Sequence, residues 1–247
     1  MSPVFVIARA EFKRIFVSPL AWAVLAVVQL LLGFVFINML VDYLRNVAEQ
    51  DQFLGLSDYV GGYLYGFATI IFLLVMPLMT MRLFAEERKN GSLTLLLSSP
   101  ASLVEIVLGK YLGLMGFMAA LAVLLALMPL SLALGTHLDY GRIAAGLLSL
   151  FLLLMSFGAA GLFVSSLTRE PTIAAVGSFG LLLLIWLLQI LSYQETPLAG
   201  VFGYLSLVTH YDNLRRGIFD LADVVYYFLF TGLFLWLTVQ RLDMERN

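Results

Sequence analysis

Polar chemistry in this sequence is concentrated in one stretch, Phe84–Lys110, which lies between two long hydrophobic segments. The stretch opens with four consecutive charges, turns at Asn90 and Gly91, and is then uncharged as far as Val104; the four charges are Glu86, Glu87, Arg88 and Lys89. Mixed acids and bases of this kind can present a polar docking surface to a partner protein. A simpler interpretation is a membrane-surface loop whose cations snorkel towards the lipid headgroups.

Patterns typical of catalysis or metal binding do not occur elsewhere in the sequence. The two histidines, His137 and His210, lie far apart, whereas a metal site needs three or four convergent ligands. There is no cysteine, no GxxxxGK[ST] phosphate loop, and no HExxH or GxSxG motif. We therefore expect a chain that is not an enzyme and that holds no metal or cofactor of its own.

Composition indicates which elements carry the polar stretch. Of the 247 residues, 62% are hydrophobic and 12% are charged, whereas a soluble protein is about half apolar and a quarter charged. Such a chain is a polytopic membrane protein, and a helix of about 20 apolar residues crosses the hydrocarbon. Charge-free runs predict one transmembrane domain, 1-247, with six spans at about 19-41, 60-83, 106-134, 142-167, 171-193 and 223-241.

The predicted fold is therefore an all-α membrane protein, and its orientation follows from Lys and Arg. Ten of these residues fall on the side that carries both termini and four on the other, which predicts both termini in the cytoplasm. Residues 1-18 are expected to form an interfacial amphipathic helix. Glu11 interrupts its apolar stripe and is interpreted either as a partner of Arg14 or as a contact with a cytoplasmic protein. A re-entrant element is expected between spans 5 and 6.

Glycine spacing inside the spans favours close helix packing. Gly109 and Gly113, like Gly62 and Gly66, have the small-xxx-small spacing that lets two helices approach each other. We interpret both pairs as packing sites within the chain rather than as a dimer face.

If this membrane protein performs energy-requiring work, the sequence offers no site within the chain that could supply the energy. No acidic or basic side chain lies deep in a predicted span, whereas ion-coupled carriers need ligands or titratable groups there. The polar stretch is then the best candidate for receiving energy from a partner.

Local signals within the stretch predict a short helix between two longer ones. Gly91 can adopt the left-handed conformation that ends a helix, with Asn90 before it. Ser92–Leu97 can continue as a short interfacial helix, and a turn at Ser99 and Pro100 follows. Ser102 and Glu105 have the spacing of a capping box that opens the third span.

The same stretch resembles the ABC-2 type exporter permeases. The resemblance is carried by the string from Ala85 to Leu93, by Leu95-Leu96-Leu97, by Ser99-Pro100-Ala101-Ser102 and by Glu105 to Lys110. Near the N-terminus, Ala10-Glu11-Phe12-Lys13 and Ser18-Pro19-Leu20-Ala21 are most similar to the gliding-motility-type branch. The chain departs from the family pattern at Thr94, where an acidic residue is common, and at Leu103, where Arg is common.

The resemblance implies a transmembrane subunit that pairs with a second copy or a related permease and with two cytoplasmic ABC ATP-binding subunits. ATP and Mg would be bound by those partners, and the loop 84–105 would carry the coupling helix that docks them. The chain would be a multi-pass protein of the bacterial cytoplasmic (inner) membrane, contacting the lipid bilayer and no nucleic acid. The expected docking residues are Glu11, Glu86, Glu87, Arg88, Lys89, Gly91, Ser92, Leu93, Ser99 and Pro100.

Two other functions remain open at this point. A partner-driven complex could transmit force to extracellular or periplasmic machinery without exporting a substrate, with the outer segments Asp42–Asp58 and Glu195–Asp223 as working surfaces. An ion-coupled carrier is disfavoured because the predicted spans lack deep charges.

Overall fold

The computed structural model describes residues 2–47, 55–134, 137–193 and 199–246, and every regular element in these residues is a helix. Their order is α1 (Pro3–Val17), α2 (Pro19–Asp42), the π-helix η1 (Tyr43–Val47), α3 (Leu56–Thr80), α4 (Ala85–Lys89), α5 (Ser92–Leu97), α6 (Leu103–Ser131), the 3-10 helix η2 (Leu132–Leu134), α7 (Tyr140–Leu167), α8 (Pro171–Ser192), α9 (Ala199–Leu205), α10 (Leu207–Arg215) and α11 (Leu221–Arg246). Parts of the predicted outer segments, 48–54 and 194–198, lie outside the described residues.

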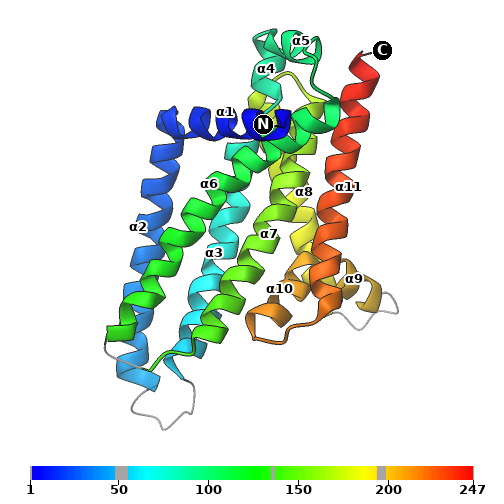
Figure 1. Cartoon of the computed structure of the whole chain (residues 1–247). Coiled ribbons are helices and arrows are strands. Elements are labelled where there is room, and N and C mark those ends of the chain that lie inside the picture. Colours follow the sequence, from blue (N-terminus) through cyan, green and yellow to red (C-terminus); the bar gives the residue numbers. More distant parts are fainter. Residues whose placement is uncertain (1, 48–54, 135–136, 194–198, 247) are drawn as a thin grey trace.

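Long helices form a bundle with a different set of short helices at each end (Figure 1). At one end, the α5 end, α1 lies across the bundle and α4 and α5 project beyond it. The last turns of α11 lie at this end too, as an even number of crossings requires. The opposite end, the α10 end, carries α9 and α10.

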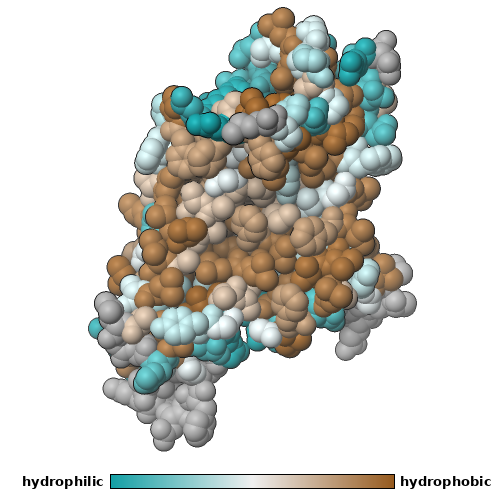
Figure 2. All heavy atoms as spheres, viewed as in Figure 1, coloured by the Kyte–Doolittle hydropathy of each residue, from teal (hydrophilic) through white to brown (hydrophobic). Residues whose placement is uncertain are grey.

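Six spans in the described residues are long and apolar enough to cross a membrane. The second of them runs from α3 into α4, and the other five correspond to α2, α6, α7, α8 and α11. Figure 2 shows a broad hydrophobic band around the middle of the molecule, with hydrophilic residues gathered towards its two ends. These findings confirm the predicted all-α fold with six membrane-spanning helices.

Helix α11 is longer than the sequence predicted. It continues to Arg246, five residues beyond the predicted end of the sixth span at 241. Charged residues end the apolar span there, but they do not end the helix. Its charged last turns therefore extend the bundle at the α5 end.

The elbow between α1 and α2 is set by one proline. Pro19 occupies the first turn of α2, where its missing N–H is not needed. The residue before a proline is driven away from helical backbone angles, and Ser18 is extended with φ -73 and ψ 129. Helix α1 therefore ends at Val17, and the chain changes direction there.

A break separates α3 from α4, where the sequence predicted a span to 83. Helix α3 ends at Thr80, three residues after Pro77, and residues 81–84 form turns. A single hydroxyl on α7 satisfies the backbone of this break: Ser165 Oγ accepts hydrogen bonds from the N–H groups of Phe84 and Ala85, both at 3.2 Å, and donates to Met81 O at 3.1 Å. Helix α4 can therefore take its own direction without leaving buried amides unpaired.

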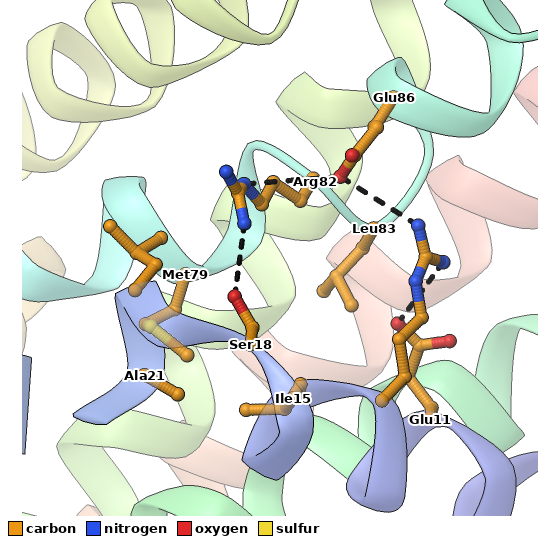
Figure 3. A pocket seen from close by; sticks show the side chains of 10 residues that line it. Glu11, Ile15, Ser18, Ala21, Met79, Arg82, Leu83 and Glu86 are labelled. Carbon is orange, nitrogen blue, oxygen red and sulfur yellow. Dashed lines mark hydrogen bonds and ion pairs between the residues drawn. The ribbon is translucent and has the colours of Figure 1, made fainter. Parts of the chain in front are cut away.

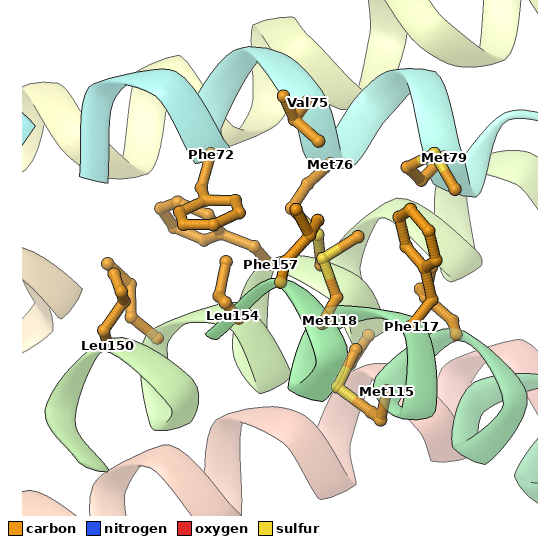
Figure 4. Close-up of a cluster of buried hydrophobic side chains, with 14 of the residues drawn as sticks. Phe72, Val75, Met76, Met79, Met115, Phe117, Met118, Leu150, Leu154 and Phe157 are labelled. Atoms are coloured by element: carbon orange, nitrogen blue, oxygen red, sulfur yellow. The ribbon is translucent and has the colours of Figure 1, made fainter. Parts of the chain in front are cut away.

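A cluster of buried hydrophobic side chains lies where α3, α6 and α7 meet (Figure 4). Phe72 and Met76 of α3, Phe117 of α6 and Phe157 of α7 are all fully buried. Methionines such as Met115 lie among the rings, and flexible thioether side chains fill irregular gaps of this kind.

Helix α6 presents a row of glycines to α1. A Cβ atom at Gly113 would lie 2.7 Å from Glu11 Cβ and 3.0 Å from the backbone oxygen of Ala8, and one at Gly109 would lie 2.6 Å from Ile7 Cβ. The pair Gly109 and Gly113 thus serves packing within the chain. By contrast, a Cβ at Gly62 would have nothing within 4 Å.

We expect Gly113→Ala to lower the stability of the α1–α6 contact. The added methyl group would meet α1 backbone, and overpacking of this kind costs about 1–3 kcal/mol. The melting temperature in detergent should fall, and trypsin should cleave sooner after Lys13.

Gly180→Ala is the matched control, because a Cβ there has no neighbour within 4 Å. Alanine in a helix should leave its melting temperature equal or raise it slightly. Equal melting temperatures for the two variants would contradict close packing at Gly113.

Candidate functional site

Helices α1, α4 and α6 meet at the α5 end through a set of charges that is largely buried except for Arg14. We call it the Lys110 network: Glu11, Arg14, Glu87 and Lys110. Lys110 Nζ lies 2.7 Å from Glu87 Oε1 and 3.3 Å from Glu11 Oε2. Arg14 lies 2.9 Å from the same Glu87 oxygen and 3.7 Å from Glu11. Two cations from α1 and α6 thus share two carboxylates from α1 and α4.

Burial makes this network a strict requirement of the fold. Lys110 is 1% exposed although it lies inside a membrane-spanning helix, and Glu11 is 8% exposed. A buried ammonium without partners is very costly, so both carboxylates have to be present. Lys110 Nζ also lies 5.4 Å from the centre of the Phe84 ring, whose face attracts a cation. The network therefore fixes α4 against α1 and α6.

A looser group of charges continues the network towards the α1–α2 elbow (Figure 3). Glu86 lies 3.6 Å from Arg14 and 3.8 Å from Arg82, and Arg82 donates a hydrogen bond to Ser18 Oγ at 3.1 Å. These side chains are a third or more exposed, so their ion pairs contribute little to stability.

The other side of α4 is tied to α11 and to the turn between α7 and α8. The Arg88 side chain, 7% exposed, pairs with Glu245 at 2.5 Å and donates to Thr168 O at 3.2 Å. Lys89 pairs with Glu170 at 2.8 Å, and both side chains are about half exposed. Helix α4 is thus connected to the last turn of α11 as well as to the Lys110 network.

Helix α5 projects from this platform. Asn90 ends α4, and Gly91 follows in the left-handed region at φ 73, which reverses the chain into α5. Within α5, Leu93 is buried whereas Leu95 is 75% exposed. At the start of α6, Ser102 Oγ accepts a hydrogen bond from the Glu105 N–H, and the Glu105 carboxylate accepts one from the Ser102 N–H, which is a capping box.

A cavity of about 420 Å³ opens beside α5. Its lining combines leucines of α5 with charged residues of three other segments: Arg88, Leu93, Thr94, Leu97, Arg169 and Glu245. Arg169 is exposed there, in the turn between α7 and α8. The α5 end thus offers an apolar helix with a polar groove next to it, a combination suited to protein contact.

The predicted docking residues differ in burial and in ion pairing in the structure. Glu11, Glu87 and Arg88 are buried or nearly so and are paired within the chain. Glu86 and Lys89 are ion-paired and more exposed, Leu93 is buried and Ser99 is half-buried. Those open to solvent without an ion pair are Gly91, Ser92 and Pro100.

Sequence reasoning missed several members of this site. It did not single out Leu95, and it took Lys110 as the end of the polar stretch rather than as a buried residue of α6. A lone lysine just inside an apolar helix was an available signal, because such a residue needs a carboxylate partner. Nothing in the sequence pointed to Glu245, which is 157 residues from its partner.

His210, considered at first for a metal site, has a structural role at the α10 end. Its Nδ1 lies 2.5 Å from Asp223 Oδ1 and its Nε2 lies 2.8 Å from Tyr204 O, while its ring stacks on that of Tyr226 at 4.2 Å. No group of three or more potential metal ligands occurs in the described part of the chain.

Tyrosine hydroxyls complete this contact. Tyr226 donates to Leu205 O and Tyr227 to Leu207 O, both at 2.7 Å, which satisfies carbonyl groups at the corner between α9 and α10. Burial raises the pKa of Tyr211, whose protonated hydroxyl donates to Tyr65 O at 2.8 Å. We call this set of contacts of α11 with α9 and α10 the His210 clamp.

Fold and site together define a polytopic membrane protein whose α5 end carries a network of ion pairs and a projecting short helix. The chain belongs to the ABC-2 family transporter proteins, whose family model matches residues 5–239. It is the transmembrane component of an ABC transporter, and such subunits are not themselves catalytic and normally pair with cytoplasmic ATP-binding subunits. A comparison with curated proteins found no match.

We expect Lys110→Met to destabilise the fold, by up to about 3–5 kcal/mol, because it removes the buried cation from two carboxylates and leaves them only the more exposed Arg14. Chemical unfolding followed by tryptophan fluorescence would measure this loss. Lys89→Met is the control: it removes a lysine from an exposed pair and should cost less than about 1 kcal/mol. Similar losses for the two variants would contradict a central role for the Lys110 network.

Asp223→Asn should loosen the His210 clamp, because it removes a buried charge that binds the imidazole. The expected loss is about 1–3 kcal/mol in the same unfolding measurement. Asp220→Asn alters an exposed carboxylate three residues away and should be nearly neutral. The interpretation fails if Asp223→Asn unfolds like the unmodified protein.

Proposed function

We propose that this chain is the transmembrane subunit of an ATP-driven exporter that docks a separate ATP-binding subunit through the stretch 84–105. The observation that carries the proposal is the position of α5: Leu95, 75% exposed, projects from a platform whose charges are already paired. The exposed Leu95 provides an apolar contact. A groove of about 420 Å³ on another side of α5, lined by Leu93, Thr94 and Leu97, adds polar and charged side chains next to it.

In this proposal the paired charges play a different part from the one first expected. Glu87 and Arg88 do not reach the partner but fix α4 to α1, α6 and α11. A push on α5 would then move α4 as a unit, because the pairs of Glu87 with Lys110 and of Arg88 with Glu245 are short and largely buried. The docking contact itself would use α5 and the groove, including the exposed Arg169.

Helix α11 provides a route from the docking surface to the far end. It is continuous from Leu221 to Arg246, about 39 Å at 1.5 Å per residue. Near one end Glu245 pairs with Arg88 of α4, and near the other Asp223 pairs with His210. Movement of α4 during ATP hydrolysis could thus change the position of α9 and α10, which would bias the bundle between inward and outward states.

The complete assembly follows from the same proposal. Two ATP-binding subunits would bind ATP and Mg and would contact the α5 end in the cytoplasm. A second copy of this chain, or a related permease, would complete the path through the bacterial inner membrane. The gliding-motility-type branch is the subfamily that we propose, on the N-terminal motifs described above.

A second function is favoured by the same α11 connection. A subunit that carries force from α4 to α9 and α10 need not move a substrate, and it could act on extracellular or periplasmic machinery. Substitution of exposed residues in 216–220 would then abolish function, while this chain would still stimulate the ATPase activity of its partner subunit. In an exporter the same changes should leave transport largely intact.

Leu95→Asp should abolish co-purification of the ATP-binding subunit without altering the melting temperature of the isolated chain. The substitution removes a leucine contact worth about 1.5–3 kcal/mol and places a carboxylate that must be desolvated at the interface. The affinity for the ATP-binding subunit should therefore fall at least about tenfold. Ile218→Asp is the control, because Ile218 is 61% exposed and lies between α10 and α11, at the other end of the bundle.

The orientation of the chain in the membrane can be tested with single introduced cysteines, because the chain has no cysteine of its own. A single cysteine introduced by Ser92→Cys should react with an impermeant maleimide only from the cytoplasm, and one introduced by Asp220→Cys only from outside. Crosslinking of Ser92→Cys to the ATP-binding subunit would support docking. Labelling of Ser92→Cys from outside would overturn the proposed topology.

A further inference from the structure

A small cavity of about 200 Å³ lies in the elbow between α1 and α2, against the end of α3 and the start of α4 (Figure 3). Its lining has an apolar part and a charged part; the residues used below are Ile15, Ala21, Met79, Arg14, Arg82 and Glu86. Figure 3 shows Glu86 joined by a dashed line to Arg82, with Ile15 and Ala21 on the α1 and α2 side of the cavity.

The cavity lies at the depth of lipid headgroups. The apolar span of α2 begins at Pro19, directly after the elbow, and Arg82 follows the end of α3 at Thr80 by two residues. Cationic side chains at the ends of spans mark the boundary between hydrocarbon and headgroups. Trp22, 60% exposed beside the cavity residue Ala21, is a residue type enriched at that boundary.

The charged part of the cavity is balanced and loosely held. Arg14, Arg82, Glu11 and Glu86 contribute two positive and two negative charges. Glu86 lies 3.6 Å from Arg14 and 3.8 Å from Arg82, and both separations are longer than a hydrogen bond. One nitrogen of Arg14 is hydrogen-bonded to Glu87 at 2.9 Å and one of Arg82 to Ser18 at 3.1 Å. A guanidinium group has five N–H donors, so the other donors of both groups and the acceptors of Glu86 remain available to a ligand that carries both signs.

We propose that this cavity binds the headgroup of a zwitterionic phospholipid with a primary amine, phosphatidylethanolamine. The phosphate would accept hydrogen bonds from Arg82 and Arg14, and the ammonium would donate to Glu86. The acyl chains would lie along apolar surface next to the cavity, where Leu78 of α3 is 40% exposed. This inference does not rest on the proposed export function.

Charge balance distinguishes this lipid from the alternatives. An anionic headgroup without an amine would satisfy the arginines but would place further negative charge beside Glu86 and Glu11. A choline headgroup has a cation without N–H donors, so it cannot hydrogen-bond to Glu86. The shared chemistry, a phosphate joined to an ammonium, also occurs in soluble phosphoethanolamines, which lack the acyl chains that would anchor them.

The test uses the full chain, purified in detergent and stripped of lipid. Phosphatidylethanolamine, phosphatidylcholine and phosphatidylglycerol with identical acyl chains, and soluble glycerophosphoethanolamine, are titrated while bound lipid is counted by native mass spectrometry. We expect phosphatidylethanolamine to bind at least about tenfold more tightly than the other three, the effect of one or two charged hydrogen bonds. Equal binding of the three lipids, or an equally strong effect of the soluble compound, would overturn the proposal.

Two variants locate the effect in this cavity. Arg82→Gln should remove the preference for phosphatidylethanolamine, whereas Arg9→Gln, on an exposed arginine of α1 outside the cavity, should retain it. Glu86→Gln leaves the arginines in excess and should shift the preference towards phosphatidylglycerol. An unchanged preference in Glu86→Gln would overturn the site even if Arg82→Gln proved unstable.

Discussion

The fold at the α5 end depends on the burial of one ammonium group. Lys110 is 1% exposed within an apolar helix, so carboxylates from elsewhere have to reach it. They come from α1 and α4, at 3.3 and 2.7 Å. This requirement explains why α1 lies across the bundle rather than leaving it, and why α4 is held against α1 and α6. The glycines of α6 are needed for the same reason: larger side chains at these positions would keep α1 too far from α6 for Glu11 to reach Lys110.

The paired charges also determine what remains available for a partner. Once Glu87 and Arg88 are engaged within the chain, the accessible part of the polar stretch is α5 and the groove beside it. The left-handed Gly91 sets the start of the short helix α5, and the capping box at Ser102, five residues after α5 ends, sets the start of α6. A surface held in this way loses little conformational entropy when it binds, which favours specific docking.

Much of the fold could be predicted from the sequence, because its main determinants are local. Charge-free runs predicted six spanning helices, and the residues around Gly91 and Ser102 predicted where short elements begin and end. The Lys110 network could not be predicted in the same way, since Lys110 is 99 residues from Glu11 and 23 from Glu87. The break after Thr80 was not predicted for a similar reason. Its backbone N–H groups are hydrogen-bonded to the hydroxyl of Ser165 on α7, which lies 80 or more residues further along the chain.

The two ends of the bundle are held by interactions that respond differently to force. Arg14 lies within 4 Å of three carboxylates, those of Glu11, Glu86 and Glu87, so α4 can shift while Arg14 exchanges one partner for another. At the α10 end, His210 and the tyrosines of α11 make hydrogen bonds, mostly to backbone carbonyl groups. Each of these hydrogen bonds has one fixed partner, so it cannot pass from one partner to another as the ion pairs of Arg14 can. In the proposed mechanism a movement of α4 would therefore be graded, whereas the His210 clamp would be either closed or broken. A continuous α11 between them would convert a gradual motion at one end into a two-state change at the other.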